Sequence, residues 1–193
     1  MINTDAISLL NWYYQRFPGQ PFLGSEDDFL CAVANYRFLR SALIPRATKT
    51  LRVAHTMDVR FLADQFGFGT DNNFFDFASK VLNLLDDESF PVYNRQIALV
   101  FDKPFTTPND NDIDYPGKDI LDHQEAIYQD VVETYRDLQN HQIVNDFRKE
   151  FNCPDFSFVK ILDIVFTELG KLLDKEGYEP SPAEFLKEHH TQS

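Results

Sequence analysis

The hydrophobic positions along most of the chain recur every three or four residues, the period of an amphipathic α-helix. The segments with this pattern lie near residues 5–17, 25–45, 47–65, 72–85, 97–101, 120–139, 141–151, 156–173 and 181–190. No segment shows the sustained alternation of apolar and polar residues that is typical of a half-buried strand. We therefore predict an all-α fold, a compact orthogonal array of about seven to nine helices, with residues 1–193 forming a single domain.

Residues that start or stop helices support this division. Thr4 is expected to cap the first helix, and Ser25 followed by Asp28 has the spacing of a capping box at the start of the second. Pro45 is expected to end or interrupt the second helix, because proline lacks the backbone N–H that an interior helical position needs. Segment 156–173 is apolar on nearly every side, which is typical of a central core helix.

Two segments fall outside the helical pattern. Residues 102–117 are rich in Asp, Asn and Pro and are expected to form a mobile loop, longer than compact domains usually keep. Residues 177–193 are expected to be a loose tail, within which 181–190 fits a last surface helix. The alternating aspartates of 110–114 have the spacing that opens a calcium loop, but Tyr and Leu stand where that loop needs Gly and Glu. We predict no metal site and no cofactor.

The composition supports a folded domain inside the cell. The chain has 193 residues, of which 43% are hydrophobic, and its 19 Phe provide much of the volume that a core needs. The first residues lack the basic start and apolar run of a secretory signal. No stretch of about 18 uncharged apolar residues occurs. We therefore predict a cytoplasmic protein with no membrane partner.

The formal net charge is −13, which opposes non-specific binding to nucleic acid. The acidic residues are concentrated in the second half of the chain, whereas the window 37–60 carries six basic residues and one acidic residue. We call this window, with net charge +5, the basic island. Its candidate nucleic-acid-binding residues are Arg37, Arg40, Arg46, Lys49 and Arg52. These side chains have two interpretations, since they can follow a phosphate backbone or pair with the acidic half of the chain.

A motif in the middle of the chain resembles a known family. Gly67 and Gly69 are followed by a helical segment to residue 85 and then by Phe-Pro-Val-Tyr-Asn-Arg at 90–95. The order is similar to that of helix-hairpin-helix DNA glycosylases, in which a Gly-x-Gly hairpin, a helix and Phe-Pro-[Ile or Val]-x-Asp precede another helix. In that family the hairpin amides approach a DNA phosphate, and the Asp faces the flipped nucleotide. The resemblance implies a candidate hairpin at Gly67 and Gly69, and a candidate pocket at Tyr93, Asn94 and Arg95.

The same motif argues against catalysis. Asn94 stands where the family has its Asp, and a neutral amide can cap a helix but cannot stabilise a developing positive charge. No Lys follows the hairpin closely, and Lys80 lies too far along the next helix to take the place of a lyase residue. We therefore assign no catalytic residue. Without the resemblance, the same residues have a structural interpretation: the glycines cap one helix, Phe90 is an apolar lead-in, and Asn94 caps the next.

These observations predict a non-catalytic helical domain that resembles DNA glycosylases and is associated with nucleic acid through the basic island, or with a protein partner. The alternative is an acidic helical protein–protein interaction module with no role on nucleic acid. A third interpretation is an active enzyme whose site the sequence does not identify.

Overall fold

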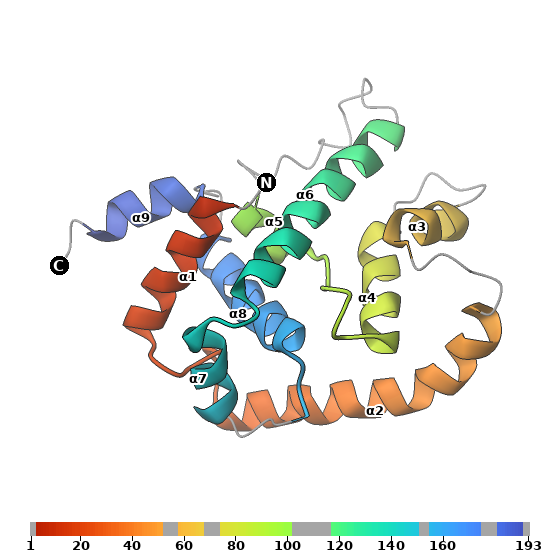
Figure 1. Ribbon diagram of the computed structural model, residues 1–193, viewed down its shortest axis with the longest axis horizontal. Helices are drawn as coiled ribbons and strands as arrows, with labels where there is room; N and C mark the ends of the chain where they lie inside the picture. The colour runs from red at the N-terminus through yellow and green to blue at the C-terminus, as the bar shows by residue number, and fades with distance from the viewer. Residues whose placement is uncertain are drawn as a thin grey trace.

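The computed structural model describes residues 3–51, 58–67, 74–101, 117–150, 155–174 and 181–190. Within these ranges it contains nine α-helices and no β-strand (Figure 1), which confirms the all-α prediction. In chain order the helices are α1 (Thr4–Arg16), α2 (Glu26–Leu51), α3 (Val59–Gly67), α4 (Phe75–Leu85), α5 (Arg95–Phe101), α6 (Gly117–Leu138), α7 (Gln142–Glu150), α8 (Phe158–Leu173) and α9 (Pro182–His190).

Helix α8 lies at the centre of the arrangement (Figure 1), as predicted for the apolar segment 156–173. It packs most extensively against α5 and also contacts α1 and α7. Within α8 the side chains of two adjacent pairs of residues have no exposed surface. These residues are Ile161, Leu162, Val165 and Phe166. The buried apolar residues of α1 to α9 form one continuous core around this helix.

The contact between α5 and α8 requires a glycine. A Cβ atom added to Gly170 would lie 2.0 Å from the backbone oxygen of Gln96, which is far inside van der Waals contact. The absence of a side chain at this position therefore lets the two helices approach closely.

Capping residues fix the starts of several helices. The hydroxyl of Ser25 accepts from the Asp28 N–H at 3.1 Å, and the Asp28 carboxylate accepts from the Ser25 N–H at 3.2 Å, which confirms the predicted capping box. The prediction for α1 was wrong by one residue. The Asn3 side chain accepts from the Ala6 N–H at 3.0 Å, so Asn3 is the cap and Thr4 is the first helical residue.

The expectation for Pro45 was also wrong. Helix α2 continues through this position to Leu51, and Figure 1 shows it curving over its last turns. A proline removes one backbone hydrogen bond, and a long helix can lose one such bond and bend rather than end. The segment 47–65 is consequently divided between α2 and α3, and residues 52–57 lie outside the described residues.

The two predicted irregular segments are only partly covered. Residues 102–116, with the aspartates of 110–114, lie outside the described residues. Part of the predicted tail forms α9, which packs on α1 and buries the ring of Phe185. None of the described helices combines the length and apolar character needed to cross a membrane.

Candidate functional site

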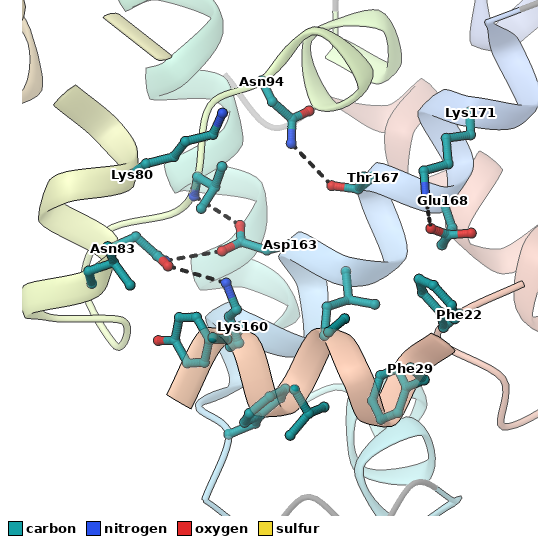
Figure 2. Close-up of a pocket in the computed structure, with 17 residues that line it drawn as sticks. Phe22, Phe29, Lys80, Asn83, Asn94, Lys160, Asp163, Thr167, Glu168 and Lys171 are labelled. Atoms are coloured by element: carbon teal, nitrogen blue, oxygen red, sulfur yellow. Dashed lines mark hydrogen bonds and ion pairs between the residues drawn. The ribbon is translucent and has the colours of Figure 1, made fainter. Parts of the chain in front are cut away.

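A cavity of about 370 Å³ lies between α2, α4, α8 and the segment that leads into α5 (Figure 2). Its apolar lining consists of Phe22, Phe29, Ala32, Val33, Tyr36, Leu84, Val92, Phe156 and Ile164. Its polar lining consists of Lys80, Asn83, Asn94, Lys160, Asp163, Thr167, Glu168 and Lys171. A cavity of this size with apolar walls and a few polar groups is typical of small-molecule sites.

One face of α8 forms the floor of the cavity. Lys160, Asp163, Thr167 and Lys171 are spaced by three or four residues and therefore share that face, as does Glu168. The other faces of the helix carry the apolar side chains of the core. The helix thus turns its polar stripe towards the cavity, although Asp163 and Glu168 are among the buried polar residues of the protein.

Asp163 occupies the centre of this face, and both of its carboxyl oxygens accept hydrogen bonds. The Val92 N–H donates to Oδ1 at 3.0 Å, and the side-chain amide of Asn83 donates to Oδ2 at 3.1 Å. Burial raises the pKa of Asp163 to about 7, and the positive charge of Lys160 and these hydrogen bonds oppose that rise only in part. The phenol of Tyr135 on α6 faces the same carboxyl group. Asp163 therefore exchanges a proton near neutral pH.

Lys160 and Asn83 extend this network towards α2 (Figure 2). The Lys160 ammonium donates a long hydrogen bond of 3.4 Å to the Asn83 side-chain oxygen and lies 4.1 Å from the centre of the Tyr36 ring. The Asn83 amide also donates to the backbone oxygen of Phe90 at 2.6 Å. Asn83 is therefore held in place by three groups and fixes the position of the lysine and aspartate around it.

A second charged pair lies at the other end of the cavity, near Phe22 and Phe29. Glu168 accepts from the ammonium of Lys171 and, at 3.2 Å, from the backbone N–H of Leu23. The Lys171 ammonium lies 5.3 Å from the centre of the Phe22 ring. Both oxygens of this buried carboxylate are thus bound by the protein itself.

Asn94 lies at the edge of the cavity, at the start of α5. Its side-chain oxygen accepts from the Ile97 N–H at 2.8 Å, and its side-chain amide donates to the Thr167 hydroxyl at 3.2 Å. The residue therefore caps α5 and connects that helix to α8.

The other two candidate pocket residues lie elsewhere. The ring of Tyr93 is buried against Phe75 in the core, with the ring centres 5.1 Å apart. Arg95 is partly exposed and pairs with Asp174 just beyond α8. The structure therefore brings Asn94 to the cavity and places its two sequence neighbours away from it.

The candidate hairpin is only partly described. Gly67 is the last residue of α3, and Gly69 lies outside the described residues. Helices α3 and α4, which flank the glycines, pack against each other. The residues that join them, 68–73, lie outside the described part of the chain.

Two arginines of the basic island pair with acidic residues of the second half of the chain. Arg37 forms a bidentate pair with Asp155, with 2.8 Å between Nε and Oδ2. Arg60 on α3 pairs with Asp122 and Glu125 on α6. The side chains of Arg40, Arg46, Lys49 and Arg52 lie outside what the structure describes.

The sequence interpretation missed the polar face of α8. It described segment 156–173 only as an apolar core helix, although Lys160, Asp163, Thr167 and Lys171 have regular helical spacing within it. That spacing was the available signal, because a polar stripe on a core helix must face solvent, another polar group or a cavity. Lys80 was considered only as a lyase residue.

The described residues contain no group of three or more His, Cys, Asp or Glu side chains that would hold a metal ion. Comparisons of the chain with family models, with curated proteins and with solved structures gave no significant match.

Proposed function

We propose that the protein is a non-catalytic binding domain on a plan similar to that of helix-hairpin-helix DNA glycosylases, and that the cavity between α2, α4 and α8 is its binding site. The observation that carries the proposal is the polar face of α8, on which Asp163 and Glu168 are buried. This face puts two carboxyl groups and two ammonium groups on the floor of an otherwise apolar cavity.

The energetic cost of this arrangement supports a functional role. Removing an ionisable group from water costs several kcal/mol even after relaxation, and a buried ion pair is often less stable than apolar residues of similar volume. Asp163 and Glu168 are nevertheless buried on this helix. Ionisable groups that line a cavity, and that have perturbed pKa values, are concentrated at functional sites.

The contacts of Asn94 support the absence of glycosylase chemistry. The side chain is a neutral amide whose oxygen is used by the N-terminus of α5 and whose nitrogen donates to Thr167. It therefore offers no charge to stabilise a sugar that becomes positive as its base leaves. The carboxylates of the cavity, Asp163 and Glu168, already accept hydrogen bonds on both oxygens.

A fragment screen with a matched pair of α2 variants tests the binding site. Ala32 lines the cavity and is solvent-accessible, so Ala32→Phe should fill the cavity without disturbing the core, whereas Ala34→Phe adds the same ring to an exposed position outside the lining. A library of nucleosides, aromatic carboxylates and uncharged aromatic compounds would be screened by protein-observed NMR. We expect hits that shift the side-chain amides of Asn83 and Asn94, that disappear in Ala32→Phe and that persist in Ala34→Phe. Hits that survive Ala32→Phe would place the site elsewhere, and no hits would refute the proposal.

An excision assay tests the absence of catalysis. Duplex oligonucleotides that contain uracil, 8-oxoguanine or mispaired adenine should remain intact with the natural protein. Asn94→Asp restores the charge that the glycosylase pattern has and is the matched variant. Base release by the natural protein that depends on Asp163 or Glu168 would identify an active enzyme.

The second candidate function is association with nucleic acid, and the position of Asn94 favours it. Asn94 lies at the start of α5 and at the edge of the cavity, which is the placement that the resemblance implies for the residue facing a flipped nucleotide. Phosphate contacts would come from the basic island. Binding to duplex DNA should then be measurable at about 20 mM salt and weaken as salt is added. The logarithm of the binding constant should fall against the logarithm of the salt concentration with a slope near −0.9 per phosphate neutralised. Replacing both Arg46 and Lys49 by Glu should flatten that slope.

The pairs that Arg37 and Arg60 form favour the opposite outcome, in which the basic island neutralises the acidic half of the chain. No binding of DNA at about 20 mM salt would remove the nucleic-acid function, since counterion release is strongly favourable there. The cavity would then serve an acidic helical module that binds small molecules or protein partners.

A further inference from the structure

The cavity is positively charged within a strongly acidic protein. The whole chain has a net charge of −13. The cavity lining contains three lysines and two acidic residues, and no arginine or histidine, so its net charge is +1 when both acids are ionised. Burial raises the pKa of Asp163 to about 7, and near neutral pH part of the protein therefore has one negative charge fewer in the cavity. A local positive charge enclosed by apolar walls attracts an anion more strongly than an exposed one does.

The two acids of the cavity are satisfied by the protein, and this leaves the lysines to bind a ligand. Glu168 is bound by Lys171 and by the Leu23 N–H, and Asp163 is bound by two N–H donors. A cationic ligand would also be repelled by the three lysines of the same lining. The acids therefore orient the lining and do not themselves recognise a cation.

Of the three lysines, Lys80 has an interaction that a ligand can replace at small cost. Lys80 pairs with Asp76 one turn earlier on α4, and both side chains are about half exposed. Exposed pairs with this spacing stabilise a helix only weakly. Lys160 is held more firmly, because its ammonium group donates a 3.4 Å hydrogen bond to the Asn83 oxygen, lies 4.1 Å from the centre of the Tyr36 ring and is attracted by Asp163. A carboxylate ligand offers the Lys80 ammonium group a charge-assisted hydrogen bond in place of the pair with Asp76.

The remaining lining gives the cavity two different ends. Figure 2 shows Lys80, Asn83 and Lys160 on the side of α4, and Phe22 and Phe29 on the other side. The rings of Tyr36 and Phe156 and the side chain of Ile164 add apolar surface to the lining. The end at Phe22 and Phe29 also holds Glu168 and Lys171, whose opposite charges offset each other, whereas the end at α4 holds two lysines and one acid. A ligand that matches both ends therefore has an anionic head and an apolar body.

We propose that the cavity binds a small aromatic carboxylate, whose carboxylate group pairs with Lys80, in a lining that Lys160 also makes positive, and whose ring packs against the aromatic side chains of α2 and its flanking segments. This inference rests on the proposed function and names the ligand class of the same site. The ring displaces water from apolar surface, and the carboxylate fixes the orientation of the ligand in the cavity.

A series of naphthyl compounds with one ring system and different head groups tests the charge. The probes are 2-naphthoate, 2-naphthyl phosphate, the neutral 2-naphthamide and the cationic 2-naphthylmethylamine, each titrated into the full chain by calorimetry. We expect 2-naphthoate to bind about tenfold more tightly than 2-naphthamide, the ratio that one charge-assisted hydrogen bond provides. The amine should bind most weakly. If 2-naphthyl phosphate binds more tightly than 2-naphthoate, the ligand class is a phosphate monoester and the assignment of a carboxylate is overturned.

A matched lysine variant locates the recognition. Lys80→Gln should reduce the ratio of the naphthoate and naphthamide affinities by several-fold, because the partly exposed Lys80 side chain can be replaced without unfolding the core. Lys149→Gln removes a lysine of α7 that is largely exposed and outside the cavity, and it should leave the ratio unchanged. An equal ratio in the natural protein and Lys80→Gln, or equal affinities for the two compounds, overturns the inference.

The two proposals fail in different ways. If naphthamide and naphthoate bind equally and Ala32→Phe abolishes both, the cavity is a binding site and the assignment of the ligand class is wrong. If none of the four compounds binds at millimolar concentration while other fragments bind in the cavity, the ligand class is likewise rejected. If no fragment of any class is lost in Ala32→Phe, the proposed function itself fails.

Discussion

Replacing Asp163 by Asn should change how the stability of the protein depends on pH. Asp163 is buried in the floor of the cavity, and burial raises its pKa from 3.8 to about 7. The groups that face it are Lys160 on the same helix, Asn83 on α4, the Val92 N–H, and Tyr135 on α6. Asn has nearly the same shape as the protonated carboxyl group but does not titrate in this range. The substitution therefore removes the proton that links pH to folding.

The sign follows from the number of protons bound in each state. Between about pH 4 and pH 7 the folded protein keeps the proton on Asp163, whereas the unfolded chain has released it. The free energy of unfolding contributed by this group therefore decreases as pH rises through this window, by about 1.4 kcal/mol per pH unit. Above pH 7 both states are ionised and the contribution is constant. Between pH 5.5 and pH 8 the total decrease should be about 2 kcal/mol.

Urea unfolding of the natural protein and of Asp163→Asn, at half-unit steps from pH 5.5 to pH 8, measures this contribution. The quantity of interest is the difference between the two free energies of unfolding at each pH, because other titrating groups and any constant change in packing cancel in its slope. We expect Asp163→Asn to gain stability relative to the natural protein as pH rises, and the difference to level off above pH 7. A difference that is constant over the range, or that changes in the opposite direction, would refute the reasoning.

Three further predictions concern the elements that position the cavity. Gly170→Ala should lower the free energy of unfolding by about 3 kcal/mol or more, the upper end for an overpacked contact, because the new Cβ would meet the Gln96 backbone. Gly24→Ala should lower it much less, because there the new Cβ meets a side-chain ring, and calorimetric melting compares the two variants. Ser157→Ala should cost about 1 kcal/mol in urea unfolding, because the hydroxyl caps α8; no loss would show that the cap is dispensable. Arg60→Gln should cost about 1 kcal/mol or less, and the cost should shrink in 0.5 M salt, because it breaks partly exposed pairs with two acids on α6; a salt-independent cost would indicate packing instead.

Most of the fold could be predicted because its signals are local. The capping box at Ser25 and Asp28 needs only four neighbouring residues, and the structure forms both of its hydrogen bonds. The apolar run of 156–173 can be stable in water only when other helices surround it, and α8 is the central helix. In such segments the local pattern and the tertiary structure require the same conformation.

The errors occur where two local signals compete. Pro45 disfavours a helix, but the surrounding residues of α2 favour one, and in the structure the helix continues. Asn3 and Thr4 are both good N-caps, and sequence alone does not rank adjacent candidates. Asn3 is selected because its side-chain amide also donates to the Phe101 backbone oxygen, a contact across 98 positions of the chain.

The cavity itself could not be predicted, because its lining comes from segments that are far apart in sequence. Phe22 and Lys171 lie close together, and so do Asn83 and Asp163, only after all the helices have packed. What the sequence does contain is the spacing of the polar residues on α8. This spacing predicts that one side of a core helix meets something polar, but it does not identify what.

Asn94 and Asp163 differ in how far a role in folding accounts for the residue found at each position. A neutral Asn is among the best residues for starting a helix, and Asn94 makes the bond that this role requires, so folding alone accounts for it. Asp163 accepts from the Val92 N–H on one oxygen and from the Asn83 amide on the other, and it does so at the cost of a buried ionisable group. Burial of an acid costs stability, and this acid also lines the cavity, which makes its position a candidate for function. The glycosylase-like motif led to Asn94, but Asp163 and the lysines around it are where functional variants of this protein should be sought first.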